Sequence, residues 1–213
     1  MKILSVRRGF ASDHSSTSYE FLAVDKPLSK NDILEVSKLS RRADPTSRQV
    51  NFIYHVDGYD IPGGWEKLME KYYDIMYRED YDWWTLSMAW IATPGQYDEL
   101  RHFAFDGEHD EASLGINVSN DKRRITVTLS CTLDTSDIYY GYDEDGETEA
   151  FETDDPLLNL LTRIRQQLVR GDYRALYAVW EKYGDVNGEL APPKPQDLKT
   201  GQGAVKNFKK MLI

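Results

Sequence analysis

Cysteine is almost missing from this 213-residue chain, which has only Cys131. A single cysteine excludes an intrachain disulfide and a zinc site built mainly from thiolates. The fold must therefore be held together by its core, and a chain of this length can bury roughly 70% of its unfolded surface. Because no disulfide is needed, we expect a reducing, cytoplasmic compartment.

Long hydrophobic runs and an excess of positive charge are missing too. Nowhere do about 18 apolar residues follow one another, as a membrane-spanning helix requires, and the first residues, MKILSVRRGF, contain no apolar stretch long enough for a secretion signal. The formal net charge of -10 argues against general nucleic-acid binding, because such proteins neutralise phosphates with clustered Lys and Arg. We expect a soluble, acidic, cytoplasmic protein that binds another protein and no membrane.

Aromatic residues are plentiful and concentrate in the segment 60–91, which holds four of the five tryptophans. Its first half has apolar residues at the spacing of one helical face, which predicts an amphipathic helix over 65–76, followed by a charged turn at 78–82. Its second half alternates large and small side chains, which predicts a central strand over 84–91 that is covered on both faces. We interpret these rings as core packing in preference to an aromatic ligand site.

The rest of the chain predicts a single α+β domain over residues 1–190, followed by a Pro-rich connection and a short basic tail over 191–213. Its largely antiparallel sheet has about five or six strands with packed helices, and a helical hairpin ends the domain. Alternating apolar residues predict the other strands at 2–6, 19–24, 48–56 and in the hairpin 114–118 with 125–133. Helical spacing and caps predict helices at 29–40, 97–103, 157–170 and 172–183.

Two stretches carry a resemblance. IPGGWEKLMEKYYDIMYREDYDWWTLSMAW and LVRGDYRALYAVW are similar to segments of a family of uncharacterised bacterial proteins, in which a YDWWTL strand is followed by an RGD-x-RALY helix. With the start GFASDHSSTSYEF, the resemblance spans most of the chain to about Pro195. It implies a bacterial domain of unknown function, either a short member or the N-terminal domain of a longer architecture. It implies no reaction and no catalytic residue.

The first candidate site is the polar loop RRGFASDHSSTS near the N-terminus. It has the residue types of a hydrolase triad, but triads are assembled from distant segments. It could also hold a phosphate through hydroxyl and backbone N–H groups, although it lacks the P-loop spacing. A loop that bonds to its own backbone is the favoured interpretation. The candidate ligand-binding residues are Arg7, Arg8, Asp13, His14, Ser15 and Ser16.

The second candidate is the acidic segment 134–155, which has ten Asp and Glu and no Lys or Arg. Within it, Asp143, Asp145, Glu149 and Glu152 match ligand positions of a calcium-binding loop of the EF-hand kind. Gly141 stands at the first ligand position, however, and no helix is predicted before it. A solvated acidic loop is therefore favoured, with calcium as the alternative and no other cofactor predicted.

Function stays open between two classes. The leading hypothesis is a non-catalytic binding or protein-interaction domain, which uses the acidic segment 134–155 or the basic segment 194–210 as its contact. The alternative is an enzyme or binder that acts on a phosphate-containing small molecule or nucleotide through the N-terminal loop. The histidines at 55, 102 and 109 show no metal-binding spacing, and RGD at 170–172 is interpreted as a helix break.

Overall fold

The computed structural model describes residues 16–41, 43–55, 61–81, 83–109, 112–122, 124–136, 153–185 and 190–213. Its centre is one seven-stranded sheet in the order β2-β1-β3-β4-β7-β6-β5, in which every neighbouring pair is antiparallel. This confirms the α+β class, with one strand more than the upper expectation. The strands are β1 Ser16–Leu22, β2 Gln49–His55, β3 Ile75–Asp80, β4 Trp83–Ile91, β5 Phe105–His109, β6 Ala112–Asp121 and β7 Arg124–Thr132.

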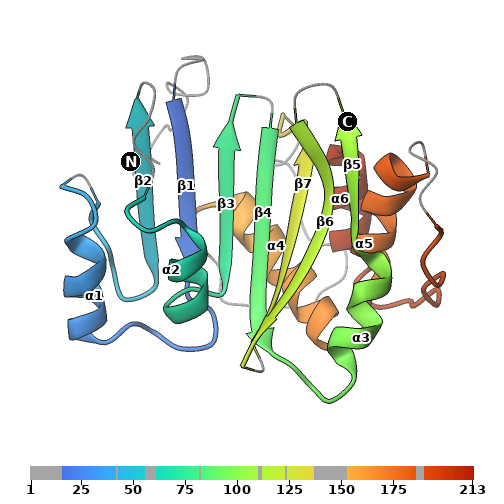
Figure 1. The fold of residues 1–213 in the computed structure, drawn as a ribbon, viewed down its shortest axis with the longest axis horizontal. Coiled ribbons are helices and arrows are strands. Elements are labelled where there is room, and N and C mark those ends of the chain that lie inside the picture. The colour runs from blue at the N-terminus through green and yellow to red at the C-terminus, as the bar shows by residue number, and fades with distance from the viewer. Residues whose placement is uncertain are drawn as a thin grey trace, which may run out of the picture.

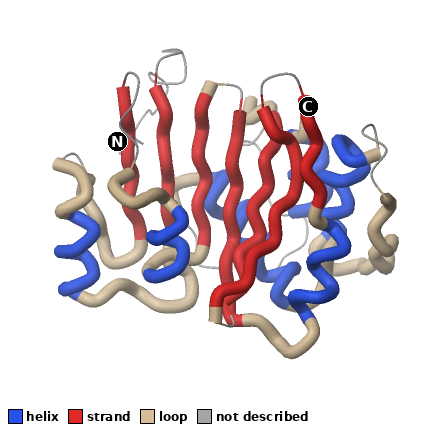
Figure 2. Tube along the Cα trace, in the orientation of Figure 1, coloured by secondary structure: helices blue, strands red, loops and turns tan. Residues whose placement is uncertain are grey.

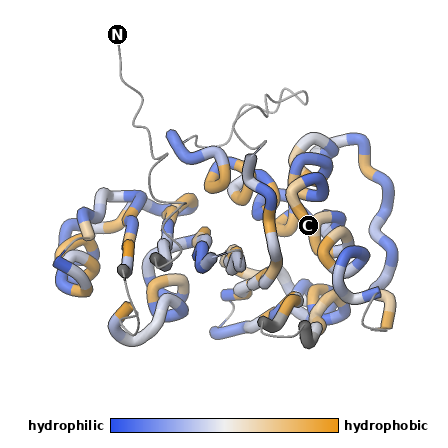
Figure 3. The backbone as a smooth tube through the Cα atoms, turned by 90° about the horizontal axis from the view of Figure 1, so that it is seen from above, coloured by the Kyte–Doolittle hydropathy of each residue, from blue (hydrophilic) through white to orange (hydrophobic). Residues whose placement is uncertain are grey.

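Helices lie on both sides of this sheet, and they are offset along it (Figures 1 and 2). The view from above shows the same two groups on opposite sides of the strands (Figure 3). In the part of the chain described, no helix combines the length and the apolar character that crossing a bilayer requires. In front lie α1 Lys30–Ser37 and α2 Glu66–Lys71, and behind lie α4 Pro156–Val169, α5 Arg174–Val179 and α6 Gln202–Met211. The remaining turns are α3 Gln96–Leu100, the 3-10 turn η1 Arg101–Phe103 and the π-helical turn η3 Trp180–Gly184.

Strand β4 is the middle strand and contributes to both cores, as its alternation predicted. Its large residues join the cluster under α4, α5 and α6, which we call the rear core. Ala89 points the other way, into the cluster under α1 and α2, which we call the front core. Because successive side chains of a strand point to opposite faces, one strand can supply both. The rear core receives Trp84, Leu86, Met88 and Trp90 from β4.

The predicted helix over 65–76 is only half right. Helix α2 ends at Lys71, and after Tyr72 the chain enters β3, so that the predicted charged turn is largely strand. The consecutive residues Ile75, Met76 and Tyr77 are all buried, one face toward each core. Helical spacing could not reveal this, because β3 forms by pairing with β1 and β4, and non-local pairing overrides local propensity.

Several local predictions are confirmed. Ser29 caps α1, and Asp32 completes the capping box. The hairpin of β6 and β7 has the predicted alternation, although its turn lies after Asp121 and not at 119–122. Cys131 is buried in the rear core, where burial raises the pKa of its thiol and leaves it unreactive.

The C-terminal residues pack on the same rear core. Helix α4 ends at Val169, and the positive φ of 83° at Gly171 marks the predicted helix break. Helix α5 follows as the second arm of the helical hairpin. Phe208 of α6 is fully buried, and Leu212 forms a β-bridge with Leu133. The apolar face of the basic tail therefore docks on the domain. The division of the chain at residue 190 stays a prediction.

A buried ion network joins the two cores. The carboxylate of Asp74 accepts hydrogen bonds from the backbone N–H groups of Val24 and Asp25 at 2.7 and 2.9 Å, and one from Arg124 of β7 at 2.9 Å. Arg165 of α4 lies 3.9 Å from the same carboxylate and donates to the carbonyl of Ala89 at 2.8 Å. Charges this deep are stable only when they are paired and hydrogen-bonded, so this network fixes α4, β3 and β7 to one another.

Candidate functional site

Most of the residues predicted as sites lie outside the described part of the chain. Ser16 begins β1, and nothing further is described of its side chain. The N-terminal loop and the acidic segment therefore stay predictions, and so does calcium binding. The candidates outside the described residues are Arg7, Arg8, Asp13, His14, Ser15, Asp143, Asp145, Glu149 and Glu152.

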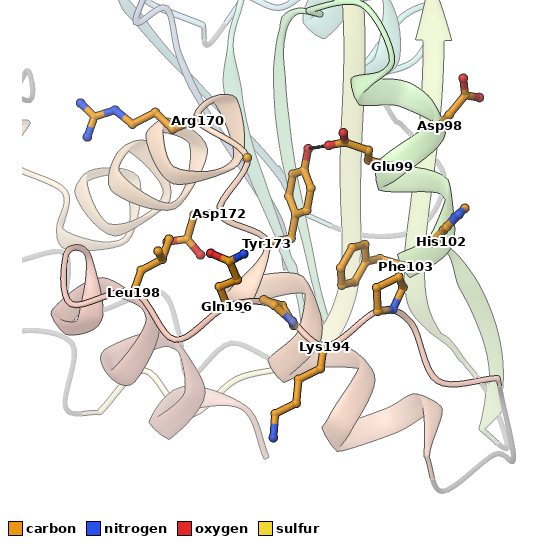
Figure 4. Close-up of a pocket in the computed structure, with 13 residues that line it drawn as sticks. Asp98, Glu99, His102, Phe103, Arg170, Asp172, Tyr173, Lys194, Gln196 and Leu198 are labelled. Atoms are coloured by element: carbon orange, nitrogen blue, oxygen red, sulfur yellow. Dashed lines mark hydrogen bonds between the residues drawn. The ribbon is translucent and has the colours of Figure 1, made fainter.

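A cavity with a volume of about 670 Å³ lies instead at the end of the rear layer. Three segments form it: the α3–η1 turn, the turn between α4 and α5, and residues 190–200, which we call the strap. The close-up shows the strap passing below the aromatic side chains of the other two segments (Figure 4). A concavity of this size is in the range that holds small organic ligands.

Two aromatic rings form the floor of this cavity. Phe103 of η1 is buried with 3% of its surface exposed, and Tyr173 precedes α5 and is half-buried. Their ring centroids are 5.5 Å apart and the planes are inclined by 60°, which is an edge-to-face contact. Pro193 and Pro195 of the strap add apolar surface on the other side. The cavity therefore offers a planar apolar group several rigid surfaces to contact.

The hydroxyl of Tyr173 is fixed within this floor. It donates a hydrogen bond of 2.8 Å to Glu99 Oε2, and the two side chains point toward each other (Figure 4). Burial and, after it, the hydrogen bond to the Glu99 carboxylate together raise the pKa of Tyr173 to about 12. Tyr173 is therefore a neutral hydrogen-bond donor at physiological pH and not a base.

The turn between α4 and α5 positions both the cavity and its strap. Gln96 of α3 is buried and donates to the carbonyl of Leu168 at 3.0 Å, while its amide oxygen accepts from the indole N–H of Trp90 at 3.0 Å. Arg174 forms an ion pair of 2.7 Å with Asp172 and donates to the carbonyl of Leu198 in the strap at 2.7 Å. These bonds hold the three walls in register.

The charges at the cavity rim are not balanced. Arg170, Lys194 and His102 are exposed basic side chains of the lining. Neither Arg170 nor Lys194 forms an ion pair with any described residue. Of the three lining carboxylates, Asp172 is neutralised by Arg174 and Asp98 lies 3.9 Å from Arg101. Glu99 accepts the Tyr173 hydroxyl and keeps its negative charge. Figure 4 shows Arg170 and Lys194 directed outward from the rim. The rim therefore leaves two flexible cations for a ligand anion.

The chemistry of the lining favours binding. The thirteen lining residues include no Ser, Thr or Cys that could act as a nucleophile. No group of three or more potential metal ligands occurs within the described ranges. His102 is the one histidine of the lining, and it stands at the exposed rim beside residues that orient no proton on it. The arrangement can hold an apolar ring and an anion.

Few sequence signals point to this cavity. RGD at 170–172 was rightly interpreted as a helix break, and the same turn also forms a wall of the cavity. The segment predicted as a Pro-rich connection lines the opposite wall. Phe103 and Tyr173 lie 70 positions apart, so only tertiary packing brings their rings together.

Comparison with known proteins does not assign the chain to a family. No family model, no curated protein and no solved structure matches the chain. The resemblance to an uncharacterised bacterial family therefore stays an expectation, and the functional argument depends on the geometry of the cavity.

Proposed function

We propose that this chain is a non-catalytic binding domain, whose ligand site is the cavity beneath the strap. The observation that carries the proposal is a floor formed by Phe103 and Tyr173 together with the rim cations Arg170 and Lys194, which pair with no carboxylate in the described ranges. The ligand is a planar apolar ring that bears an anionic group. Small-molecule sites combine such apolar surfaces with a few polar groups that fix the orientation.

The basic segment 194–210 supports this function because it contributes to the cavity and anchors the strap. Its first residue, Lys194, lies on the cavity rim, and its later part, α6, anchors the strap through the buried side chain of Phe208. The contact of a protein partner with this segment or with the acidic segment 134–155 is also proposed. Deletion of 134–155 in a pull-down tests that part, and unchanged partners would remove the acidic segment from it.

Isothermal titration calorimetry of the full chain with indole acetate, naphthoate and phenyl phosphate tests the ligand site. We expect weak but saturable binding by at least one of these aromatic anions. Replacing both rim cations, R170Q with K194Q, is expected to weaken binding about tenfold, which corresponds to about 1.4 kcal/mol. Both side chains are exposed, so this double variant should fold normally.

Two controls sharpen this test. Lys26 is an exposed lysine in the other half of the molecule, and K26Q should leave binding unchanged. Cyclohexane carboxylate keeps the anion but lacks the aromatic ring, and it should bind more weakly than naphthoate. Binding that is absent for all probes, or equal in the wild type and in the double variant, would rule out this ligand class at the cavity.

A further inference from the structure

One face of the sheet changes its chemistry between its two halves. On β1 and β2 this face carries Phe21 and Phe52, which α1 and α2 cover as the front core. Farther along, on β7 and β6, the same face carries hydroxyl and amide groups. The register places Val50, Phe21, Met76, Ser87, Thr128 and Asn117 in one row across six strands. In Figure 1, α4, α5 and α6 lie behind this polar half.

A second cavity, of about 510 Å³, opens on the polar half between α2 and the β6–β7 hairpin. Its floor is a patch of uncharged side chains, and its wall is the side of α2 that begins with Trp65. The floor consists of Asn117, Ser119, Thr126 and Thr128, and the other lining residues are Trp65, Glu66, Met69, Glu70, Asn120, Asp121 and Arg124.

The floor has spare hydrogen-bonding capacity. The side chains of Asn117, Ser119 and Thr126 have no hydrogen-bond partner in the part of the chain that the structure describes. Thr128 shares one bond of 3.3 Å with the buried hydroxyl of Ser87, which fixes its orientation and leaves further capacity. Hydroxyl and amide groups both donate and accept, so this floor complements a ligand that does the same.

The wall of this cavity contributes the apolar ring of Trp65, and its end contributes the fixed guanidinium group of Arg124. Trp65 is half-buried, because it packs against the front core, and it also lines the cavity. Arg124 is held by Asp74 at 2.9 Å and by the carbonyls of Met69 and Tyr73 at 3.1 and 2.7 Å. Its charge is therefore already balanced, and it does not call for an anionic ligand.

From these observations we infer that the cavity between α2 and the β6–β7 hairpin is a binding site for a neutral saccharide. A sugar ring presents hydroxyl groups at its edge and C–H groups on its faces, so it can bond to the floor and lie against the Trp65 ring. The exposed carboxylates of Glu66, Glu70 and Asp121 accept hydroxyl bonds and repel acidic ligands. This site is independent of the cavity beneath the strap.

Heteronuclear NMR of the ¹⁵N-labelled full chain tests the site. The probes are glucose, galactose, N-acetylglucosamine, maltose and cellobiose, each added up to tens of millimolar, as weak sugar binding requires. We expect at least one sugar to shift the Trp65 indole N–H and the backbone amides of 117, 119, 126 and 128. The indole signal is assigned from the W65F variant.

A pair of variants distinguishes the site from the rest of the face. T126V removes a floor hydroxyl while it keeps the branched side chain, and it is expected to weaken the sugar affinity about fivefold. T85V makes the same change on the same face outside the cavity and should leave the affinity unchanged. Spermidine, a polycation, is the control ligand. Three results would each overturn the inference: no shifts with any sugar, equal weakening of sugar affinity by both variants, or shifts with spermidine alone, which would indicate a cation site.

Discussion

The two cores of this molecule use aromatic residues differently. In the front core the rings of Tyr19, Phe21, Phe52, Tyr54 and Tyr73 contact one another and fill the space between α2 and the sheet. The rear core is mainly aliphatic, and at its margin it places a pair of rings, those of Phe103 and Tyr173, in an accessible cavity. Buried rings such as Trp84 and Trp90 are structural in the rear core as well, so the difference teaches that only the pair of rings at its margin marks a candidate site.

The ion network at Asp74 is the joint between the cores, so breaking it should have the largest effect. Asp74→Ala leaves the buried guanidinium group of Arg124 without its carboxylate partner, and we expect a loss of about 3–5 kcal/mol in the free energy of unfolding. Arg165 keeps its ion pair with Asp25 at 2.5 Å. Urea unfolding followed by far-UV circular dichroism measures the loss. Glu35→Ala, which removes an exposed ion pair with Lys38, is the matched control and should leave the free energy of unfolding nearly unchanged. Equal losses for both variants would show that the network does not join the cores.

Overpacking the front side of β4 should have an intermediate effect. Ala89 is fully buried in the front core, opposite the large residues that β4 sends to the rear core. Ala89→Leu adds volume where none is free and is expected to cost about 1–3 kcal/mol in unfolding free energy. Exposed Ile91 of the same strand is the control position, and Ile91→Leu should be close to neutral. A neutral Ala89→Leu would mean that the front core is loosely packed.

The cavity ring Tyr173 should matter less for stability and more for its pH dependence. Tyr173→Phe removes the hydrogen bond to the exposed carboxylate of Glu99. We expect a loss of about 1 kcal/mol in the free energy of unfolding at neutral pH. The folded state raises the pKa of this phenol to about 12 from its ordinary value of 10.0. The folded protein thus holds the proton more tightly than the unfolded chain does.

The sign of the pH effect follows from that shift. The contribution of Tyr173 is fully present below about pH 10 and is lost as the pH rises toward about 12. Other buried tyrosines also titrate late, so the quantity to measure is the difference in unfolding free energy between wild type and Tyr173→Phe at each pH. That difference should shrink across this interval. A constant difference would indicate that Tyr173 is not held protonated by the fold.

The smallest effect is expected at the surface of α6. Lys209 forms an ion pair with Glu181 on η3. Both side chains are exposed, that of Lys209 to 59% and that of Glu181 to 50%. Lys209→Ala should therefore change the unfolding free energy by about 0.5 kcal/mol or less, since the buried Phe208 anchors this helix. Thermal unfolding checks this, and a loss above that of Tyr173→Phe would contradict it.

Local signals could be read from the sequence, and contacts between distant segments could not. The cap formed by Ser29 and Asp32 and the break at Gly171 depend on neighbours in the chain, so both were predictable. The apolar spacing of 65–76 also fits a helix, but the position of β3 between two other strands decided the outcome for its last residues. The cavity floor needed packing of η1 against α5, which no local pattern reports. The interpretations of the N-terminal loop and of the segment 134–155 stay predictions.

The most direct test of the account is where an aromatic anion contacts the protein. Intermolecular nuclear Overhauser effects between naphthoate and the full chain report this position. We predict effects from the naphthoate ring to the ring protons of Phe103 and Tyr173, and their loss in the R170Q, K194Q variant at the same ligand concentration. Effects confined to front-core rings or to the β6–β7 face, or none at saturating naphthoate, would contradict the claim that the cavity beneath the strap is the binding site.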